Sequence, residues 1–182
     1  KILTGVYTKD AGTVLVDGKE VNYKNPQEAE KAGIVFIHQE LNVLFDLTVE
    51  ENLFMGKEIK NCFGICNQKE MRRKSEEALK RLGVSISPTE VMSNLSVGQQ
   101  QMIEICKALM VDAKVIIMDE PTAALTQSET TVLFEVIQTL RKAGVSIVYI
   151  SHRMEEIFEL CDRISVLRDG TYIGTKEIPQ TN

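Results

Sequence analysis

The sequence predicts an α/β fold with a parallel sheet at its centre. Residues 115–118 and 145–150 are short, almost continuously apolar segments, as expected of strands buried on both faces of a sheet. An amphipathic helix is predicted between them, over about 127–143. Strand, helix and strand in this order indicate two parallel strands joined by a crossover helix.

The helix between these strands has clear boundaries in the sequence. Thr126 and Glu129 have the spacing of a capping box, and Gly144 follows the last apolar residue. Helical spacing predicts an apolar stripe that faces the core, made of Val132, Leu133, Val136, Ile137 and Leu140. A shorter helix is predicted over 154–161, followed by a hairpin that turns at Asp169-Gly170.

The first part of the chain is predicted to be rich in β-structure. A short apolar strand, the dipeptide Asp17-Gly18 and a returning strand indicate a hairpin. Asn25-Pro26 then has the pattern of a helix start, and Gly33 that of a helix end. Residues 33–37 form a predicted strand, which leads to Gln39. The middle of the chain is predicted to be helical, over 70–82 and 99–110.

Composition narrows the class of protein. The 182 residues are 43% apolar and 26% charged, which is ordinary for a globular domain. A net charge of -5 argues against a nucleic-acid partner, and no apolar segment approaches the 18 residues of a membrane span. The four cysteines are interpreted as reduced structural thiols, because the two histidines lie far from the only close cysteine pair, Cys62 and Cys66.

The strongest chemical signal is Asp119-Glu120, directly after the apolar residues 115–118. Ligands of open α/β sheets bind at the carboxyl ends of the strands, where these two acids are predicted to lie. Strand alternation would send the carboxylates in different directions, so that one can hold Mg²⁺ and the other can face a reacting phosphate. The alternative is a strand that ends in two solvated acids.

A second signal is the sequence from Leu95 to Gln101. Ser96 can cap the predicted helix with Gln99 as its capping-box partner. The same helix start offers a serine hydroxyl and the backbone N–H of Gly98, which has no Cβ to keep a phosphate away. A helix cap and an anion site are therefore both possible here, and they are compatible with each other.

Two further side chains follow predicted strands. His152 comes after residues 145–150 and could donate a hydrogen bond to a phosphate, although a histidine in this place is more often structural. Gln39 follows the strand that ends at Ile37, where a solvated glutamine is the ordinary interpretation.

Together these residues resemble the ATP-binding cassette family over almost the whole chain. The family's motifs occur in the family's order: Gln39 for the Q-loop, 95–99 for the signature, 115–119 for the Walker B strand, Glu120 for the catalytic glutamate, 123–126 with Ala124 and Thr126 for the D-loop, and His152 for the switch histidine. The resemblance implies a P-loop NTPase-like parallel sheet with an antiparallel β subdomain and a helical signature subdomain. It divides this single domain at about 1–40, 41–112 and 113–182.

Details of the motifs resemble the monosaccharide importers of the ribose, galactose and xylose group, in particular their N-terminal cassette. The run of glutamines after the signature and the segment Glu120-Pro121-Thr122 are examples. Val97 and Thr126 stand where the wider family commonly has glycine and aspartate, and this branch tolerates both. The resemblance implies a second cassette in tandem and a place on the cytoplasmic face of a bacterial membrane.

The sequence lacks a G-x-x-x-x-G-K-[ST] motif, which is the Walker A phosphate loop. Lys1 cannot be its lysine, because Ile2 follows where serine or threonine is required. The resemblance implies that Lys1 to Gly5 is the end of the helix that begins at this loop. We therefore expect a cassette that is truncated at its N-terminus, and we expect these residues alone to be inactive.

The resemblance also implies the cofactors, partners and roles. ATP and Mg²⁺ would bind, with Asp119 and Gln39 near the metal and Glu120 polarising the attacking water. His152 would contact the γ-phosphate, while Ser96, Gly98 and Gln99 would complete the site of a second cassette that packs head to tail. Membrane permease subunits would be direct partners, and an extracytoplasmic sugar-binding protein an indirect one.

Two other functions remain open from the sequence. One is a soluble ATPase of the same family without a transport role, which would be expected to carry a basic surface or a long coiled-coil insertion. The other is a truncated cassette that acts only as a binding partner, which the missing Walker A motif favours. The intact Asp119-Glu120 pair and His152 favour an active parent protein.

Overall fold

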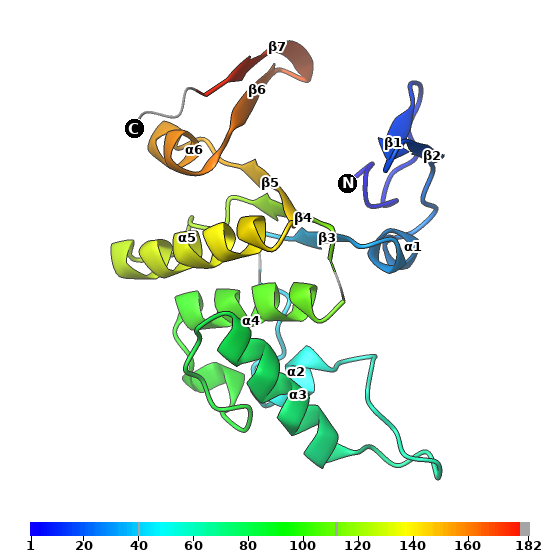
Figure 1. Ribbon diagram of the computed structural model, residues 1–182, viewed down its shortest axis with the longest axis vertical. Coiled ribbons are helices and arrows are strands. Elements are labelled where there is room, and N and C mark those ends of the chain that lie inside the picture. Colours follow the sequence, from blue (N-terminus) through cyan, green and yellow to red (C-terminus); the bar gives the residue numbers. More distant parts are fainter. Residues whose placement is uncertain (40, 112, 179–182) are drawn as a thin grey trace.

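Three parallel strands form the centre of the structure (Figure 1). The computed structural model describes residues 1–39, 41–111 and 113–178. The sheet has the order β3-β4-β5, with strands β3 (Ile34–Ile37), β4 (Val115–Asp119) and β5 (Ser146–Ile150). In the register, Ile37 lies opposite Met118 and Asp119 lies opposite Ile150, so the three strands end at the same edge. The predicted α/β class with a parallel sheet is confirmed.

Helices continue from the sheet into a separate helical layer. In Figure 1, α5 lies directly below the sheet and α4 lies below α5, with α2 and α3 at the far end. The helices are α2 (Val49–Leu53), α3 (Gln68–Arg81), α4 (Val97–Leu109), α5 (Gln127–Lys142) and α6 (Met154–Leu160). One hydrophobic core joins these layers, because buried residues such as Leu79, Ile103, Ile116 and Leu133 belong to the same packed cluster.

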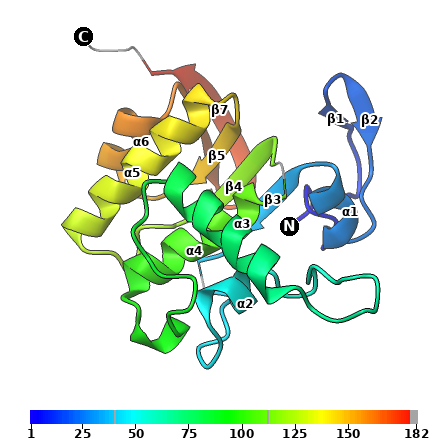
Figure 2. The same cartoon turned by 60° about the horizontal axis from the view of Figure 1, so that its bottom comes forward.

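Two antiparallel hairpins flank the sheet, as Figure 2 shows from a second direction. Strands β1 (Val14–Val16) and β2 (Lys19–Val21) form the first, and β6 (Arg163–Arg168) and β7 (Thr171–Glu177) form the second. The backbone φ angles at Asp17 and Gly18 are 51° and 75°, and those at Asp169 and Gly170 are 51° and 74°. Left-handed residues at both central positions match the twist of the strands, so both predicted hairpins are confirmed.

The predicted helix boundaries near the N-terminus are also confirmed. The side chain of Asn25 accepts a hydrogen bond from the Glu28 N–H at the start of α1 (Pro26–Lys31). At the chain start, the Val6 N–H donates to the Lys1 carbonyl and the Gly5 N–H donates to the Ile2 carbonyl, both at 3.0 Å. With Gly5 at φ 68°, this is a Schellman motif, the geometry of a helix C-terminus.

Two expectations about local structure were wrong. Strand β5 is not buried on both faces, because Val148 and Ile150 are each 42% exposed at the open side of the sheet. Val132 does not belong to the buried stripe of α5 and is 45% exposed, whereas Phe134 is buried. Two elements were not predicted, namely α2 and a 3₁₀ turn, η1 (Met92–Asn94), that precedes α4.

Among the described residues, no helix is both long enough and apolar enough to cross a lipid bilayer.

Candidate functional site

Glu120 and His152 meet at the carboxyl edge of the sheet. Nδ1 of His152 lies 3.0 Å from Oε1 of Glu120. The two residues follow neighbouring strands, and the Glu120 N–H donates to the Ile150 carbonyl over 2.9 Å, which fixes the turn after β4 to the end of β5. The side chains of His152 and Glu120 are 74% and 30% exposed, so both can be reached from solvent.

The direction of the Glu120 side chain is set by a turn. Its backbone has φ 45°, in the left-handed region that non-glycine residues with long side chains rarely adopt. Asp119 is the last residue of β4, so Glu120 does not continue the strand. Strand alternation was expected to separate the two carboxylates, and this explanation was wrong. The extended strand ends at Asp119, so the left-handed turn at Glu120 sets the direction of its side chain instead.

Asp119 and Gln39 lie at the same edge of the sheet. Asp119 is half-buried at the end of β4, and Gln39 is exposed two residues beyond the neighbouring strand β3. A carboxylate and an amide oxygen are the hard oxygen donors that Mg²⁺ accepts alongside waters and substrate phosphates. Their chemistry therefore fits this metal. The described part of the chain contains no group of three or more His, Cys, Asp or Glu side chains that could hold a metal ion.

The start of α4 has the capping box that the sequence predicts. The Gln99 N–H donates to Oγ of Ser96 over 3.2 Å, and the Ser96 N–H donates to Oε1 of Gln99 over 2.9 Å. The Gln99 side chain is thus engaged by the cap. Gly98 is buried one residue before it, whereas Val97 is 43% exposed.

A carboxylate of the chain itself occupies this helix start. Oγ of Ser96 donates to Oε1 of Glu129 over 2.7 Å. A Cβ added to Gly98 would lie 2.3 Å from Cδ of Glu129, so the carboxylate rests where only glycine leaves room. The pKa of Glu129 is lowered by the Thr126 N–H, then by the Ser96 and Thr126 hydroxyls and the Gly98 N–H. The helix start can therefore hold an anionic group.

Glu129 belongs to this site, although the sequence did not predict it there. It was interpreted only as the capping partner of Thr126, and that role is confirmed, because the Thr126 N–H donates to its Oε2 over 3.0 Å. Ala124 lies exposed in the turn between Glu120 and Thr126. The capping-box spacing was the only signal in the sequence that pointed to Glu129.

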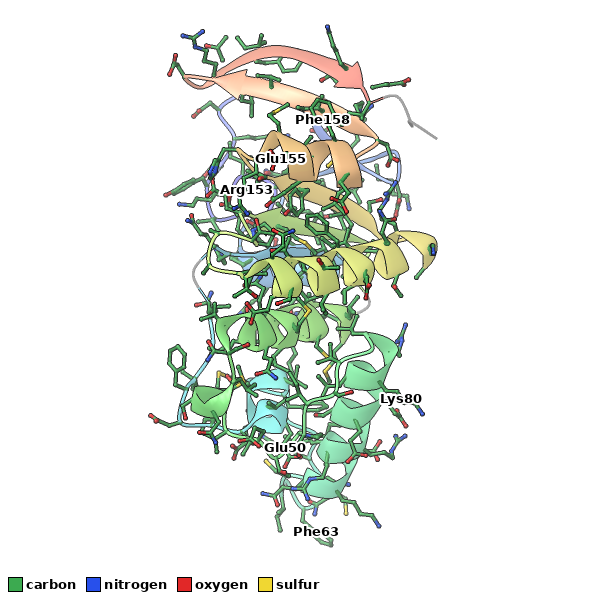
Figure 3. The ribbon with its side chains drawn as sticks, turned by 90° about the vertical axis from the view of Figure 1, so that its left-hand side faces the viewer. Glu50, Phe63, Lys80, Arg153, Glu155 and Phe158 are labelled. Carbon is green, nitrogen blue, oxygen red and sulfur yellow. The ribbon has the colours of Figure 1, made fainter. Side chains whose placement is uncertain are left out.

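The predicted residues fall into two groups. Glu120, His152 and Asp119 lie at the carboxyl edge of the sheet, whereas Ser96 and Gly98 contact Glu129 at the start of α5. Figure 3 shows Arg153, which follows His152, beside α6, with α4 on the opposite side of α5. Within the described residues, no hydrogen bond or ion pair joins Ser96 or Gln99 to Glu120 or His152. One chain therefore presents two separate candidate sites.

The fold that carries these sites also occurs in known proteins. The family described as ABC transporter matches residues 1–123. The chain belongs to this family. The ribose import ATP-binding protein of Bacillus licheniformis is 60% identical over 181 residues, and that of Geobacillus kaustophilus is 57% identical over 183 residues. Each comparison covers 100% of this chain and 37% of the relative.

Solved structures of the ABC transporter family have the same fold. A nucleotide-free ATP-binding cassette from an ABC transporter has a TM-score of 0.81 at 27% identity, over 98% of this chain and 74% of that one. The ADP conformation of another ATP-binding cassette has a TM-score of 0.80 at 28% identity, over 97% and 73%. The chain thus spans most of a solved cassette and little more than a third of its curated ABC relatives.

Proposed function

We propose that this chain is the ATP-binding and ATP-hydrolysing cassette of an ABC importer that takes up a monosaccharide of the ribose type. The observation that carries the proposal is the 3.0 Å contact between Glu120 and His152, beside Asp119 at the carboxyl edge of the sheet. The identity of 57–60% to proteins named for ribose import supports the choice of sugar class.

In the proposed reaction, Glu120 accepts a proton from a water molecule whose oxygen bonds to the γ-phosphorus of ATP. The bond from that phosphorus to the bridging oxygen breaks, and ADP leaves. The exposed imidazole of His152 contacts the γ-phosphate and, through Nδ1, keeps the Glu120 carboxylate in place. Mg²⁺, when bound, neutralises charge that develops on the phosphates. Asp119 and Gln39 would hold this metal through their side-chain oxygens.

A second cassette completes the proposed site. Ser96 and Gly98 would face the γ-phosphate that the second cassette binds, with the exposed D-loop residues Ala124 and Thr126 at the same interface. Support comes from the Glu129 carboxylate, which shows that the start of α4 accepts an oxyanion within hydrogen-bond distance of the Ser96 hydroxyl. Nucleotide-driven closure of two cassettes would then require Glu129 to move away from Ser96.

The proposed place of the protein is the cytoplasmic face of the cell membrane. Residues 41–54 lead from the sheet edge into the helical layer, and there Leu44 and Phe45 are 49% and 52% exposed. We assign this apolar surface to contact with the permease subunits. A sugar-binding protein outside the membrane would be an indirect partner that delivers the monosaccharide.

The test uses the intact polypeptide that contains this cassette, assembled with its permease in lipid vesicles. Glu120→Gln keeps the shape of the side chain but removes the base, so ATP turnover should fall by about 100-fold or more while ATP binding is retained. Phosphate release and the fluorescence of a bound ATP analogue measure the two quantities separately.

The matched control is Glu155→Gln, because Glu155 is an exposed acid on α6 (Figure 3) and lies outside the proposed site. Its turnover should equal that of the wild-type protein. Unchanged turnover in Glu120→Gln would remove Glu120 from the proposed role, and wild-type protein without any ATP turnover would overturn the proposed function.

A further inference from the structure

Glu156 is a buried carboxylate close to the candidate active site. It lies in the first turn of α6 and is only 6% exposed, although its neighbour Glu155 is exposed. Burying a carboxylate is costly unless hydrogen bonds compensate for the lost water. The hydrogen bonds of Glu156 therefore show how its burial is compensated and which segments it connects.

Four side chains donate hydrogen bonds to this carboxylate. Oε1 accepts from Thr122 Oγ1 at 2.7 Å and from Arg153 Nη1 at 2.9 Å. Oε2 accepts from the Tyr149 hydroxyl at 2.8 Å and from Ser151 Oγ at 3.0 Å. Burial raises the pKa of Glu156, but these four hydrogen bonds together bring that pKa below its ordinary value, so the group stays ionised at neutral pH.

Three of the four donors come from the two turns that carry the candidate catalytic residues, and the fourth, Tyr149, lies in strand β5. Thr122 lies two residues after Glu120, and Ser151 and Arg153 stand on either side of His152. The Arg153 N–H also donates to Oγ of Ser151 over 3.0 Å, which closes the turn around His152. Apart from the direct contact between Glu120 and His152, Glu156 is therefore the carboxylate in the described residues whose hydrogen bonds join these two turns.

We propose that Glu156 is a positioning residue that holds the turn of Glu120 and the turn of His152 at a fixed separation. Its carboxylate touches neither the substrate nor the reacting atoms, and it acts through the two side chains that do. This inference deepens the proposed function and rests on it. Small displacements of reacting groups are costly for catalysis, so such a residue affects the rate more than the binding of ATP.

The first experiment compares Glu156→Gln with Glu155→Gln in the intact polypeptide and its permease. An amide nitrogen cannot accept a hydrogen bond, so Glu156→Gln leaves two of the four donors unpaired. We expect kcat to fall by about tenfold to a hundredfold, with KM for ATP changed by less than about threefold. Glu155→Gln should match the wild-type protein.

A second pair of variants separates positioning from a general loss of stability. Thr122→Val and Tyr149→Phe each remove one hydrogen bond to the same carboxylate, but only Thr122 belongs to the turn of Glu120. We expect both variants to melt at similarly reduced temperatures, and only Thr122→Val to lower kcat. Equal values of kcat in the two variants would contradict the proposal.

A double-mutant cycle tests whether Glu156 acts through His152. In a His152→Ala background, Glu156→Gln should lower kcat by much less than it does alone, whereas a purely structural residue would have the same effect in both backgrounds. Full additivity would overturn the proposal.

Amide hydrogen exchange tests the role of Glu156 without measuring ATP turnover, so it is independent of the proposed function. In Glu156→Gln, amide hydrogen exchange should accelerate in residues 119–123 and 150–154 together, and remain unchanged in α3. If the wild-type protein does not hydrolyse ATP, the proposed function fails, and this exchange still decides whether Glu156 joins the two turns. Unchanged exchange in both segments would show that it does not.

Discussion

The carboxylate of Glu129 is shared between the starts of two helices. Oε2 accepts the Thr126 N–H at the start of α5, while Oε1 accepts the Ser96 hydroxyl at the start of α4. The first contact is local, and the spacing of Thr126 and Glu129 predicts it. The second joins residues 33 positions apart and depends on how α4 packs against α5, which no local pattern in the sequence encodes.

Gly98→Ala tests whether the contact between Glu129 and Ser96 requires a residue without a Cβ at position 98. Alanine ordinarily stabilises a helix by about 0.5–1 kcal/mol relative to glycine. Here its Cβ would lie 2.3 Å from Cδ of Glu129, so the carboxylate must leave Ser96. We expect faster hydrogen exchange at the starts of α4 and α5 in the intact protein, measured by mass spectrometry.

The control for this variant is the same substitution in a Glu129→Ala background. There the added methyl group no longer meets the carboxylate, so exchange should be no faster than in Glu129→Ala alone. Identical hydrogen exchange in Gly98→Ala and the wild-type protein would show that the Glu129 carboxylate does not need the space that glycine leaves.

At the scale of elements, caps and periodicity predict most helices and strands. The short helix α2 was missed because five residues give too little periodicity, although Thr48 and Glu51 carry the capping box that the structure confirms. Strand β5 was predicted to be buried because its residues are apolar. Whether a face is covered depends on neighbouring elements, and in this chain Val148 and Ile150 lie exposed.

Helix α4 provides a pH-dependent prediction through Cys106, which is fully buried in the core. Burial raises the pKa of this thiol from 9.0 to about 12. The unfolded chain therefore loses the proton near its ordinary value while the folded chain keeps it. Because the folded state binds more protons in this window, the free energy of unfolding should fall as pH rises from about 9 towards 12.

Alkylation at pH 8 measures the protection of Cys106 directly. Cys62 and Cys66 are exposed and should react with iodoacetamide at once, whereas Cys106 should react only after denaturant is added. Mass spectrometry of the labelled peptides distinguishes the three thiols. Equal labelling rates for Cys62 and Cys106 in the folded protein would contradict the buried position of α4.

At the scale of the whole molecule, the parallel topology brings predicted residues together. Glu120 and His152 each follow a strand of one parallel pair, so their meeting at the carboxyl edge could be predicted from the order of the strands. The buried position of Glu156 could not, because Glu155, Glu156 and Glu159 look alike in the sequence of α6. Only packing against the turns after β4 and β5 distinguishes Glu156 from the others.

The sequence of the whole chain also predicts how strongly it binds ATP and whether it releases phosphate. Its 182 residues contain no Gly-rich loop that ends in Lys and Ser or Thr, which is the motif that grips nucleotide phosphates. The isolated chain should bind ATP weakly and release no phosphate above background, whereas the intact polypeptide should turn over. Calorimetric titration and a phosphate assay measure these quantities, and robust turnover by the 182 residues alone would contradict the prediction.

The left-handed backbone of Glu120 has an evolutionary consequence. A non-glycine residue in this conformation costs roughly 1–2 kcal/mol of folding free energy, and glycine would not carry that cost. Under the proposed function, its φ of 45° therefore sets stability against activity at a single residue. A lineage released from selection for turnover would then gain stability by accepting glycine at this turn.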